Sequence, residues 1–388
     1  MAAAVLVAAS GIVVASALWG YAWLRLGGER IAVLDEEVGA AGGHGTSSPG
    51  STTVLVALTE PSDPTVRDTP PLAAGVALVQ VGGPRDGAVV LVLPRDLPIG
   101  GHRTLADVQV TGGIDALVRA AIDYTGVAVD HAVSATTDAL PALVDLRGTV
   151  ELCTASGCRD LTGDAVGVAV AQADDVDRVR TVAAVLRSLA AGFDHRSALL
   201  SPVTTKRTVD VVADLVVTDV ELRGTGLLDV ASALTDGAEL EVVTLPSLRD
   251  PSSGEVLVLP ERAEVVFQHL REGTPIGSLA LDDEPLAVGG VSVAVLNGAG
   301  VQGLAARVES RLEAEGFTVV GTGNAPPFGL ERTVVAYAPD NDAVRIAAIV
   351  LVERLGLGEL EALPSAPRFE GEPVDLLVTA GLDLDEQE

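Results

Sequence analysis

The chain has 388 residues, of which 48% are hydrophobic, and a formal net charge of −29 from 54 acidic and 25 basic residues. Its length allows two or three domains with a substantial core. So acidic a chain is repelled by a polyanion, which argues against nucleic acid as a partner and equally against electrostatic attraction to an anionic membrane surface.

The first segment is uncharged from residue 2 to residue 24. As a helix with a rise of about 1.5 Å per residue it would be roughly 34 Å long, enough to cross a hydrocarbon core of about 30 Å. Trp19, Tyr21 and Trp23 lie near its end, and aromatic side chains favour the membrane–water interface. A cleaved signal peptide would have a shorter apolar region behind a basic start. We therefore expect a transmembrane anchor over residues 1–25.

Two signals disagree about the side of the membrane on which the body lies. Arg25 and Arg30 follow the span and no Lys or Arg precedes it, which favours a cytoplasmic body. Cys153 and Cys158 are the only cysteines, and their spacing fits a small disulfide loop in an oxidising compartment. The scattered histidines offer too few further ligands for a metal site. We expect a disulfide and an extracytoplasmic body.

The sequence divides the rest of the chain into two domains. A Gly/Ser-rich stretch predicts a flexible linker over 26–53. Strand-like and helical patterns alternate over 54–272 and predict an α/β or α+β domain, a sheet flanked by helices. A second linker, 273–290, contains glycines, prolines and an acidic trio. The expected strands of the large domain are 54–58, 76–81, 88–93 and 255–259, and its expected helices are 113–124, 137–145, 175–191 and 261–271.

A smaller domain is predicted over residues 291–388. The element order βαββαβ predicts a small sheet with two helices on one face and ferredoxin-like connectivity. The turn Asn297-Gly-Ala-Gly300 precedes the first helix and could bind an anion, although tight packing is the commoner role of such a turn. The expected strands are 291–296, 317–321, 333–338 and 374–378, and the expected helices are one through Leu304, Val308 and Leu312 and one over 343–355.

One strand of the large domain points to a functional site. The apolar run 88–93 is typical of a strand buried on both faces, and it is followed by Pro94, Arg95 and Asp96. Ligands of open α/β sheets gather at the carboxyl ends of strands. Arg binds phosphate in a bidentate manner, and Asp can hold a divalent metal. The pattern predicts a phosphate-bearing substrate; alternatively, Arg95 and Asp96 pair with each other or with solvent.

Several motifs resemble known families. Residues 295–325 and the end of the chain at 374–383 resemble the LytR C-terminal domain. The upstream domain resembles the LytR–CpsA–Psr catalytic domain, in which an apolar strand ends in Pro-Arg-Asp. The further matching elements are Asp68-Thr69, Gly112-Gly113, Tyr124-Thr-Gly-Val, Asp130-His131, Leu143-Val-Asp and Arg147-Gly148.

This resemblance implies an outward-facing bacterial cell-envelope protein. Such proteins transfer a glycopolymer from a polyprenyl-diphosphate carrier to peptidoglycan with the help of Mg²⁺, a phosphoryl transfer in which arginines and metal stabilise charge. The polyprenyl tail would lie in an apolar cavity between sheet and helices. In this interpretation the catalytic residues are Arg95, Asp96 and Arg178, the substrate-binding residues are Arg95, Arg103 and Arg178, and the metal ligands are Asp68, Asp96 and Asp175.

The sequence also departs from the family pattern. Ala171 and Ala173 stand where the family has an Arg-x-Arg pair, Ala106 replaces an Asn, and Leu58 replaces a Gly. Each lost charge-assisted hydrogen bond is worth roughly 1.5–3 kcal/mol. Arg67, Arg103 or Arg180 could substitute in part. The alternative function is a catalytically impaired homologue that binds lipid-linked glycan or peptidoglycan, or that organises an envelope complex.

Overall fold

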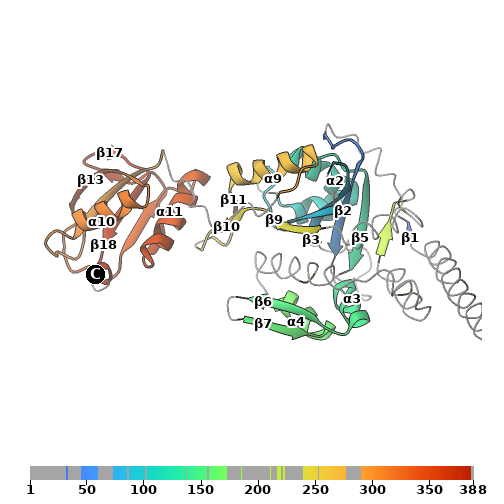
Figure 1. The fold of residues 1–388 in the computed structure, drawn as a ribbon. Helices are drawn as coiled ribbons and strands as arrows, with labels where there is room; N and C mark the ends of the chain where they lie inside the picture. Colours follow the sequence, from blue (N-terminus) through green and yellow to red (C-terminus); the bar gives the residue numbers. More distant parts are fainter. Residues whose placement is uncertain are drawn as a thin grey trace, which may run out of the picture. The chain divides into compact units, whose positions relative to one another are not determined.

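The chain divides into two compact units (Figure 1). The first consists of Met1–Pro246 and Pro260–Leu279, and the second of Ser247–Leu259 and Ala280–Glu388. The boundary at Leu279 falls inside the expected linker, but Ser247–Leu259, expected in the large domain, belongs to the second unit. The computed structural model describes residues 32–33, 45–59, 73–84, 87–100, 103–136, 138–154, 157–172, 185, 210, 216–219, 222, 239–251, 253–276 and 290–385.

The elements of the first unit, in chain order, are β1 (Ala32–Val33), β2 (Ser51–Thr59), β3 (Ala73–Gly82), β4 (Gly87–Leu93), α2 (Leu105–Thr125), β5 (His131–Thr136), α3 (Ala139–Arg147), β6 (Val150–Thr154), β7 (Gly157–Leu161), α4 (Gly163–Gln172), β8 (Val216–Thr218), β9 (Glu239–Thr244) and α9 (Pro260–Glu272). Within the described part of the chain, no helix has both the length and the apolar character needed to cross a membrane. The expected anchor over 1–25 and the expected helix over 175–191 lie outside that part.

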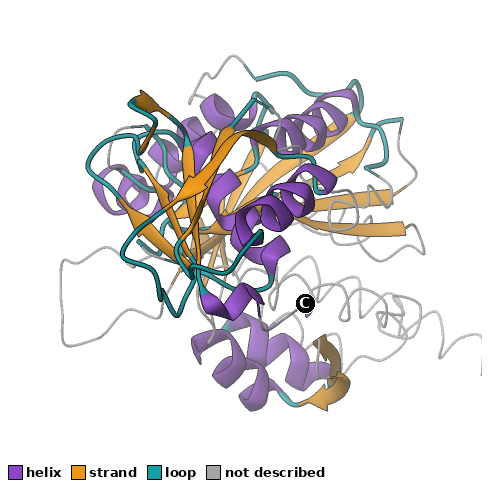
Figure 2. Ribbon diagram, turned by 90° about the vertical axis from the view of Figure 1, so that its left-hand side faces the viewer, coloured by secondary structure: helices purple, strands orange, loops and turns teal. Residues whose placement is uncertain are grey.

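A seven-stranded mixed sheet forms the centre of the first unit, with the order β1-β8-β5-β2-β3-β4-β9 (Figure 2). The pairs β2–β5 and β4–β9 are parallel, whereas β3 is antiparallel to both β2 and β4. The strands β2, β4, β5 and β9 therefore run in one direction, and their carboxyl ends meet at a single edge of the sheet.

Both faces of this sheet are buried, as the apolar run 88–93 predicts. Ala88, Val90 and Val92 contribute to one apolar cluster, whereas Val89 and Leu91 point to the other face and are completely buried. Because successive strand residues alternate between faces, this pattern requires packing on both sides. Helix α2 contacts β3 and β5, and α9 packs on α2 (Figure 1). The expected strands over 54–58, 76–81 and 88–93 are confirmed.

Helix α2 is longer than the expected helix over 113–124. It begins at Leu105 because Thr104 and Asp107 form a capping box, in which each side chain binds the other residue's backbone N–H. Gly113 interrupts it with φ 67° and ψ −161°, a conformation that favours glycine, so two helical segments meet at a kink. The sequence pattern shows only the second segment, because the Gly112-Gly113 pair is typical of a helix boundary.

Parts of the expected linker over 26–53 belong to the folded unit. Strand β1 pairs in parallel with β8. Thr46 donates its N–H to Gly126 O at 2.9 Å and accepts the N–H of Ala128 at 3.1 Å. Ser48 is also buried. The Gly/Ser composition predicted a flexible segment. Main-chain hydrogen bonds do not depend on side chains, so composition could not predict this pairing.

A smaller subassembly of the first unit contains α3, α4 and the hairpin β6–β7. Val144, Leu152 and Val166 are among the buried residues of its separate core. Cys153 and Cys158 are opposite each other in the hairpin register, and Cys158 is disulfide-bonded. Since the chain has only two cysteines, the bond closes this hairpin.

The second unit begins with the hairpin β10 (Ser247–Arg249) and β11 (Val256–Val258). It continues with β12 (Ser292–Asn297), α10 (Leu304–Ala314), β13 (Thr318–Asn324), β14 (Val334–Tyr337), α11 (Asp342–Leu355), β15 (Glu359–Ala362), β16 (Arg368–Phe369), β17 (Glu372–Pro373), β18 (Leu376–Ala380) and α12 (Leu382–Asp385). Its main sheet has the order β13-β12-β18-β14-β15, and residues of α10, α11 and the strands share one core.

The ferredoxin-like connectivity expected for this unit is wrong. The pairs β12–β13 and β14–β15 are each parallel and each joined through a helix, and β18 lies between β12 and β14. The unit is therefore two βαβ crossovers joined by the last strand. Strand β15 was not expected, because it is short, polar and at the sheet edge.

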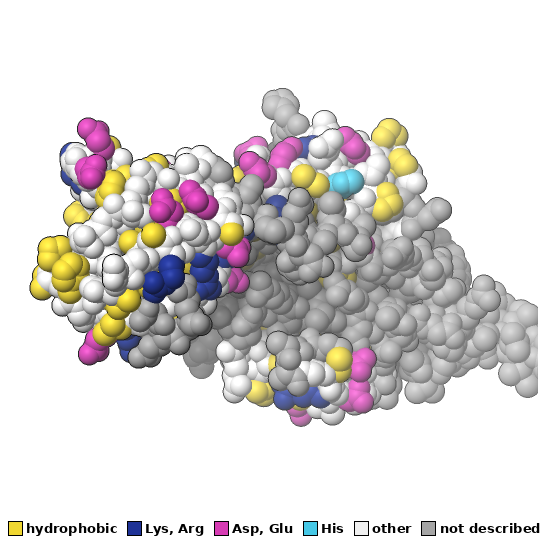
Figure 3. Space-filling model, turned by 60° about the vertical axis from the view of Figure 1, so that its left-hand side comes forward, with side chains coloured by type: hydrophobic (Ala, Val, Ile, Leu, Met, Phe, Trp, Pro, Cys, Tyr) yellow, Lys and Arg dark blue, Asp and Glu magenta, His cyan; other side chains and the backbone are white. Residues whose placement is uncertain are grey.

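On the face of this unit visible in Figure 3, acidic and basic side chains are interspersed.

Candidate functional site

The candidate site lies where β2, β4, β5 and β9 end, which we call the carboxyl edge. Strands β2 and β5 end in Thr59 and Thr136, which are register partners. Thr59 Oγ1 donates to Ala135 O at 3.4 Å. Thr136 Oγ1 is buried and has no hydrogen-bond partner among the described groups. Buried polar atoms are normally paired, so Thr136 provides a hydroxyl that a ligand at this edge could engage.

The turn that follows β4 carries Arg95 and Asp96, both half-buried. Leu97 N–H closes the turn onto Pro94 O at 3.2 Å, and the Leu97 side chain is completely buried. Ala106 N–H donates to Arg95 O at 2.9 Å, which fixes the turn against the start of α2. The main chain at Arg95 is thus held from two sides.

The backbone N–H groups at the start of α2 are already hydrogen-bonded within the protein. The N–H of Leu105 donates to Leu97 O at 3.1 Å, and that of Ala106 donates to Arg95 O at 2.9 Å. Asp107 N–H donates to Thr104 Oγ1 at 3.2 Å. A helix N-terminus binds phosphate through such free N–H groups, and here they are occupied. The N–H groups of Leu105, Ala106 and Asp107 are therefore not available to an anion at the carboxyl edge.

Arg103, expected to bind substrate, is exposed and donates to Thr111 Oγ1 at 3.1 Å. Its charge also acts on Asp107. Hydrogen bonds from the Thr104 backbone and hydroxyl lower the pKa of Asp107, and the positive charge of Arg103 adds to the effect. These described contacts place Arg103 along α2; none of them joins it to Arg95.

The other expected site residues, Asp68, Asp175 and Arg178, lie outside the described residues, as do Arg67, Ala173 and Arg180. Ala171 is exposed in the last turn of α4. Among the described residues there is no group of three or more His, Cys, Asp or Glu side chains that could hold a metal ion. Of the three expected metal ligands, only Asp96 is described.

Some residues that match the family motifs have structural roles in this chain. Asp145 Oδ1 accepts the N–H of Gly163 at 3.0 Å and so fixes the start of α4 to α3. A Cβ atom at Gly163 would lie 2.3 Å from Pro141 O, so only glycine fits there. Leu58, which replaces a family glycine, packs against the core of this subassembly. The departure at Leu58 therefore adds apolar contact.

The motif Asp130-His131 lies at the opposite edge of the sheet, where β5 begins. Asp130 Oδ2 accepts the N–H of Thr53 at 2.8 Å. Asp219 is buried and accepts the N–H of Ala132 at 2.9 Å, and its Oδ1 lies 3.3 Å from His131 Nδ1. These groups join β5 to its neighbours and are not part of the carboxyl edge.

The glycine-rich turn of the second unit is a tight packing turn. Asn297 Oδ1 accepts the N–H of Gly300 at 2.8 Å, and Ala380 O accepts those of Gly298 and Ala299, both at 2.9 Å. A Cβ atom at Gly298 would lie 2.8 Å from a methyl carbon of Thr379. With its N–H groups occupied, the turn offers no anion site.

Comparisons with known proteins agree with this organisation. Residues 290–381 match the family described as "LytR cell envelope-related transcriptional attenuator". The "Cell wall biosynthesis protein LcpA" of Corynebacterium glutamicum is 26% identical over 271 residues, which are 63% of this chain and 52% of the relative. The chain thus spans about half the length of that curated relative.

Two solved structures show weaker likeness. A "LytR-Csp2A-Psr enzyme from Actinomyces oris" is 20% identical, with a TM-score of 0.48 over 63% of this chain and 97% of that one. "B. subtilis TagV" is 12% identical, with a TM-score of 0.44 over 58% and 98%.

The sequence matches support a protein of the LytR–CpsA–Psr family. More specifically, residues 290–381 match the LytR C-terminal family, and the curated relative is a cell wall biosynthesis protein. The family resemblance found in the sequence is confirmed at this level.

Proposed function

We propose that this protein binds a polyprenyl-diphosphate-linked glycopolymer at the carboxyl edge of its first unit and transfers the glycopolymer to peptidoglycan. One observation carries the proposal: the turn bearing Arg95 and Asp96 is fixed against α2 at this edge. The relative's name, a cell wall biosynthesis protein, supports the same process. A cation held in a fixed position is what recognition of a diphosphate requires.

The reaction is a phosphoryl transfer. A hydroxyl oxygen of the acceptor glycan bonds to the sugar-bearing phosphorus, and the bond from that phosphorus to the bridging oxygen breaks. Polyprenyl monophosphate leaves, and the acceptor hydroxyl loses its proton. The side chain of Arg95 would hold the diphosphate and neutralise the charge that develops on the leaving oxygen. Thr136 would donate its hydroxyl to a phosphate oxygen.

Mg²⁺ is the expected cofactor, with Asp96, Asp68 and Asp175 as its ligands. The carboxylate oxygens of these aspartates are hard donors, which suit Mg²⁺. When bound, the metal would supply further charge neutralisation of the diphosphate. This chain's own contribution is the fixed turn that presents Asp96 beside Arg95.

The lipid part of the substrate requires an apolar surface. We propose that the tail inserts beside the apolar cluster that contains Val54, Val79, Val90 and Val92, which the chain itself buries.

The predicted anchor over 1–25 would hold the body on the extracytoplasmic side of the membrane. In intact cells treated with an impermeant reductant, an impermeant thiol reagent should then label Cys158, whereas labelling only after lysis would contradict this location.

A second candidate function is binding without transfer. Ala171 is exposed at the end of α4, where the family pattern has the first arginine of its Arg-x-Arg pair. Loss of such a phosphate ligand weakens stabilisation of the transition state more than it changes the fold. The protein would then retain the lipid-linked glycan or organise an envelope complex.

The release of polyprenyl phosphate separates the two functions. The full chain in detergent is incubated with a polyprenyl-diphosphate disaccharide, peptidoglycan fragments and Mg²⁺. We expect release that the substitution Arg95→Ala lowers at least tenfold, because a charge-assisted hydrogen bond is worth about 1.5–3 kcal/mol. Arg119→Ala is the matched control, since Arg119 is an exposed arginine on α2 that pairs with Asp115. Binding without release would favour the second function; neither binding nor release would reject both.

A further inference from the structure

The segment Ser247–Leu259, which we call the hairpin, lies in sequence between two elements of the first unit but belongs to the second. Its strands β10 and β11 are antiparallel partners. The chain therefore crosses between the units three times: after Pro246, after Leu259 and after Leu279. A single linker over 273–290, as the sequence suggested, would give only one crossing.

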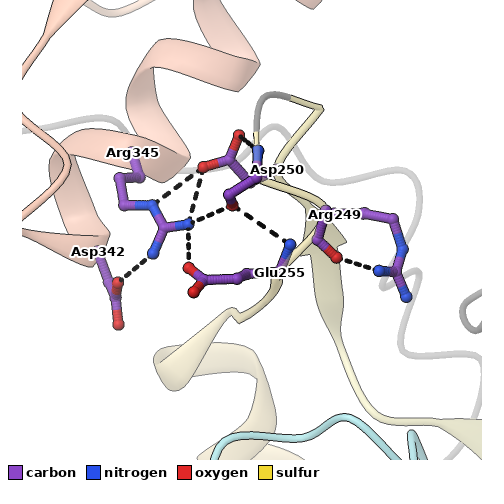
Figure 4. Close-up of polar contacts among 7 residues, drawn as sticks. Arg249, Asp250, Glu255, Asp342 and Arg345 are labelled. Atoms are coloured by element: carbon purple, nitrogen blue, oxygen red, sulfur yellow. Dashed lines mark hydrogen bonds and ion pairs between the residues drawn. The ribbon is translucent and has the colours of Figure 1, made fainter. Parts of the chain in front are cut away.

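A buried ion pair holds the hairpin on α11 (Figure 4). Arg345 donates to Asp250 Oδ2 through Nε at 3.1 Å and through Nη2 at 2.8 Å. The side chains of Arg345 and Asp250 are only 9% and 2% exposed. The same Nη2 also lies 2.6 Å from Glu255 Oε2 and 3.0 Å from Ser253 Oγ. One arginine thus binds three side chains of the hairpin.

Main-chain hydrogen bonds of the hairpin hold Asp250 and Glu255 in place for Arg345. Asp250 N–H donates to Glu255 O at 2.9 Å, and Gly254 N–H donates to Asp250 O at 2.7 Å, which closes a tight turn around the carboxylate. Leu248 packs against the apolar core of the second unit. On α11, Asp342 Oδ1 lies 3.3 Å from Arg345 Nη1 and orients the guanidinium. Removing either member of a buried pair leaves an uncompensated charge, so the two surfaces depend on each other.

We propose that the hairpin is a clasp: a docked segment through which residues 290–385 stay attached to the rest of the chain independently of the linker over 273–290. The surface of α11 around Arg345 is the receptor, and its ligand is the carboxylate of Asp250, which the closed turn of the hairpin presents. Cutting the linker therefore leaves the C-terminal fragment bound.

A nicked form of the full chain tests this directly. A protease site is inserted between Asp283 and Glu284, the protein is cleaved under native conditions, and the fragments are separated by size exclusion. The C-terminal fragment should co-elute with the remainder of the chain. Arg345→Met should lower the retained fraction at least tenfold, whereas Arg332→Met should retain the fragment. Arg332 is the matched control because it is an exposed arginine of the same unit that pairs with Glu359.

A second variant excludes misfolding of the fragment as the cause. Asp250→Asn changes only the hairpin side, so the released C-terminal fragment keeps its natural sequence and its fold is checked by circular dichroism. The clasp predicts release in this variant too, with the spectrum of the fragment unchanged. The proposal is overturned if the C-terminal fragment separates from the nicked protein that carries no clasp substitution. It is also overturned if either clasp variant retains the fragment fully.

Discussion

Arg95 and Arg345 show how burial and partners decide what an arginine does in this chain. Burial lowers the pKa of Arg345, but hydrogen bonds from its guanidinium to Asp250 and Glu255 outweigh that effect and raise it. Its donors are used within the protein, so its role is structural. The turn at Arg95 is instead held through main-chain groups, at the carboxyl edge where we propose that the diphosphate binds. Ligand binding is therefore the proposed role of Arg95, and docking of the hairpin is the proposed role of Arg345.

Tyr124 gives a prediction about alkaline stability. Its ring packs edge-on against Phe267, with centroids 5.9 Å apart, and burial raises the pKa of Tyr124 to about 12. As the pH rises from about 10 to 12, the unfolded chain ionises this group while the folded chain keeps it protonated. The free energy of unfolding should therefore be unaffected below about pH 10 and should fall through that interval.

Tyr124→Phe should make this alkaline loss smaller, because the group that ionises is removed and the ring contact is kept. Urea unfolding followed by circular dichroism at pH 9, 10 and 11 measures it. An equally steep decline in the variant would show that other groups cause the loss.

At the scale of the element, the capping box of α2 should affect both stability and binding. Thr104→Ala removes the side-chain oxygen that accepts Asp107 N–H, which should lower the free energy of unfolding by about 1 kcal/mol. Because the first turn of α2 also fixes the turn at Arg95, affinity for a diphosphate should fall with it. Thr104→Ser keeps the hydroxyl and is the control. Urea unfolding and calorimetry measure the two effects; equal stability of both variants would contradict this role.

The sequence was sufficient for elements whose signal is local. The strand over 88–93 and the placement of Arg95 and Asp96 after it follow from six consecutive apolar residues and the polar pair behind them. Pairing between distant segments was not predictable. Thr59 and Thr136 become neighbours only because β2 pairs with β5. Strand β5 was not among the expected strands, and the expected strand over 54–58 stopped one residue before Thr59.

The same limit explains the two errors of arrangement. The order of elements in the C-terminal unit is compatible with several sheet orders, and the short polar strand β15 changes which one forms. The hairpin has an ordinary strand pattern, and nothing local shows that Asp250 pairs with Arg345, 95 residues further along the chain. Long-range charge pairs have no periodicity from which to predict them.

At the scale of the whole molecule, the net charge of −29 opposes the proposed binding of an anionic diphosphate. The expected site combines three aspartates, Asp68, Asp96 and Asp175, with Arg95 and Arg178, and is therefore about one unit negative before any metal binds. A diphosphate would be repelled from such a site unless Mg²⁺ reversed the local field. Tight binding should therefore require both the metal and Arg95.

Calorimetry of the full chain in detergent with a polyprenyl diphosphate tests this claim most directly. The unmodified protein should bind in the presence of Mg²⁺ and much more weakly in its absence. Arg95→Ala should weaken binding by about 10- to 150-fold, as the loss of one charge-assisted contact of about 1.5–3 kcal/mol requires, and Arg119→Ala should leave it unchanged. Equal affinity of the Arg95→Ala variant and the unmodified protein would show that the diphosphate site lies elsewhere.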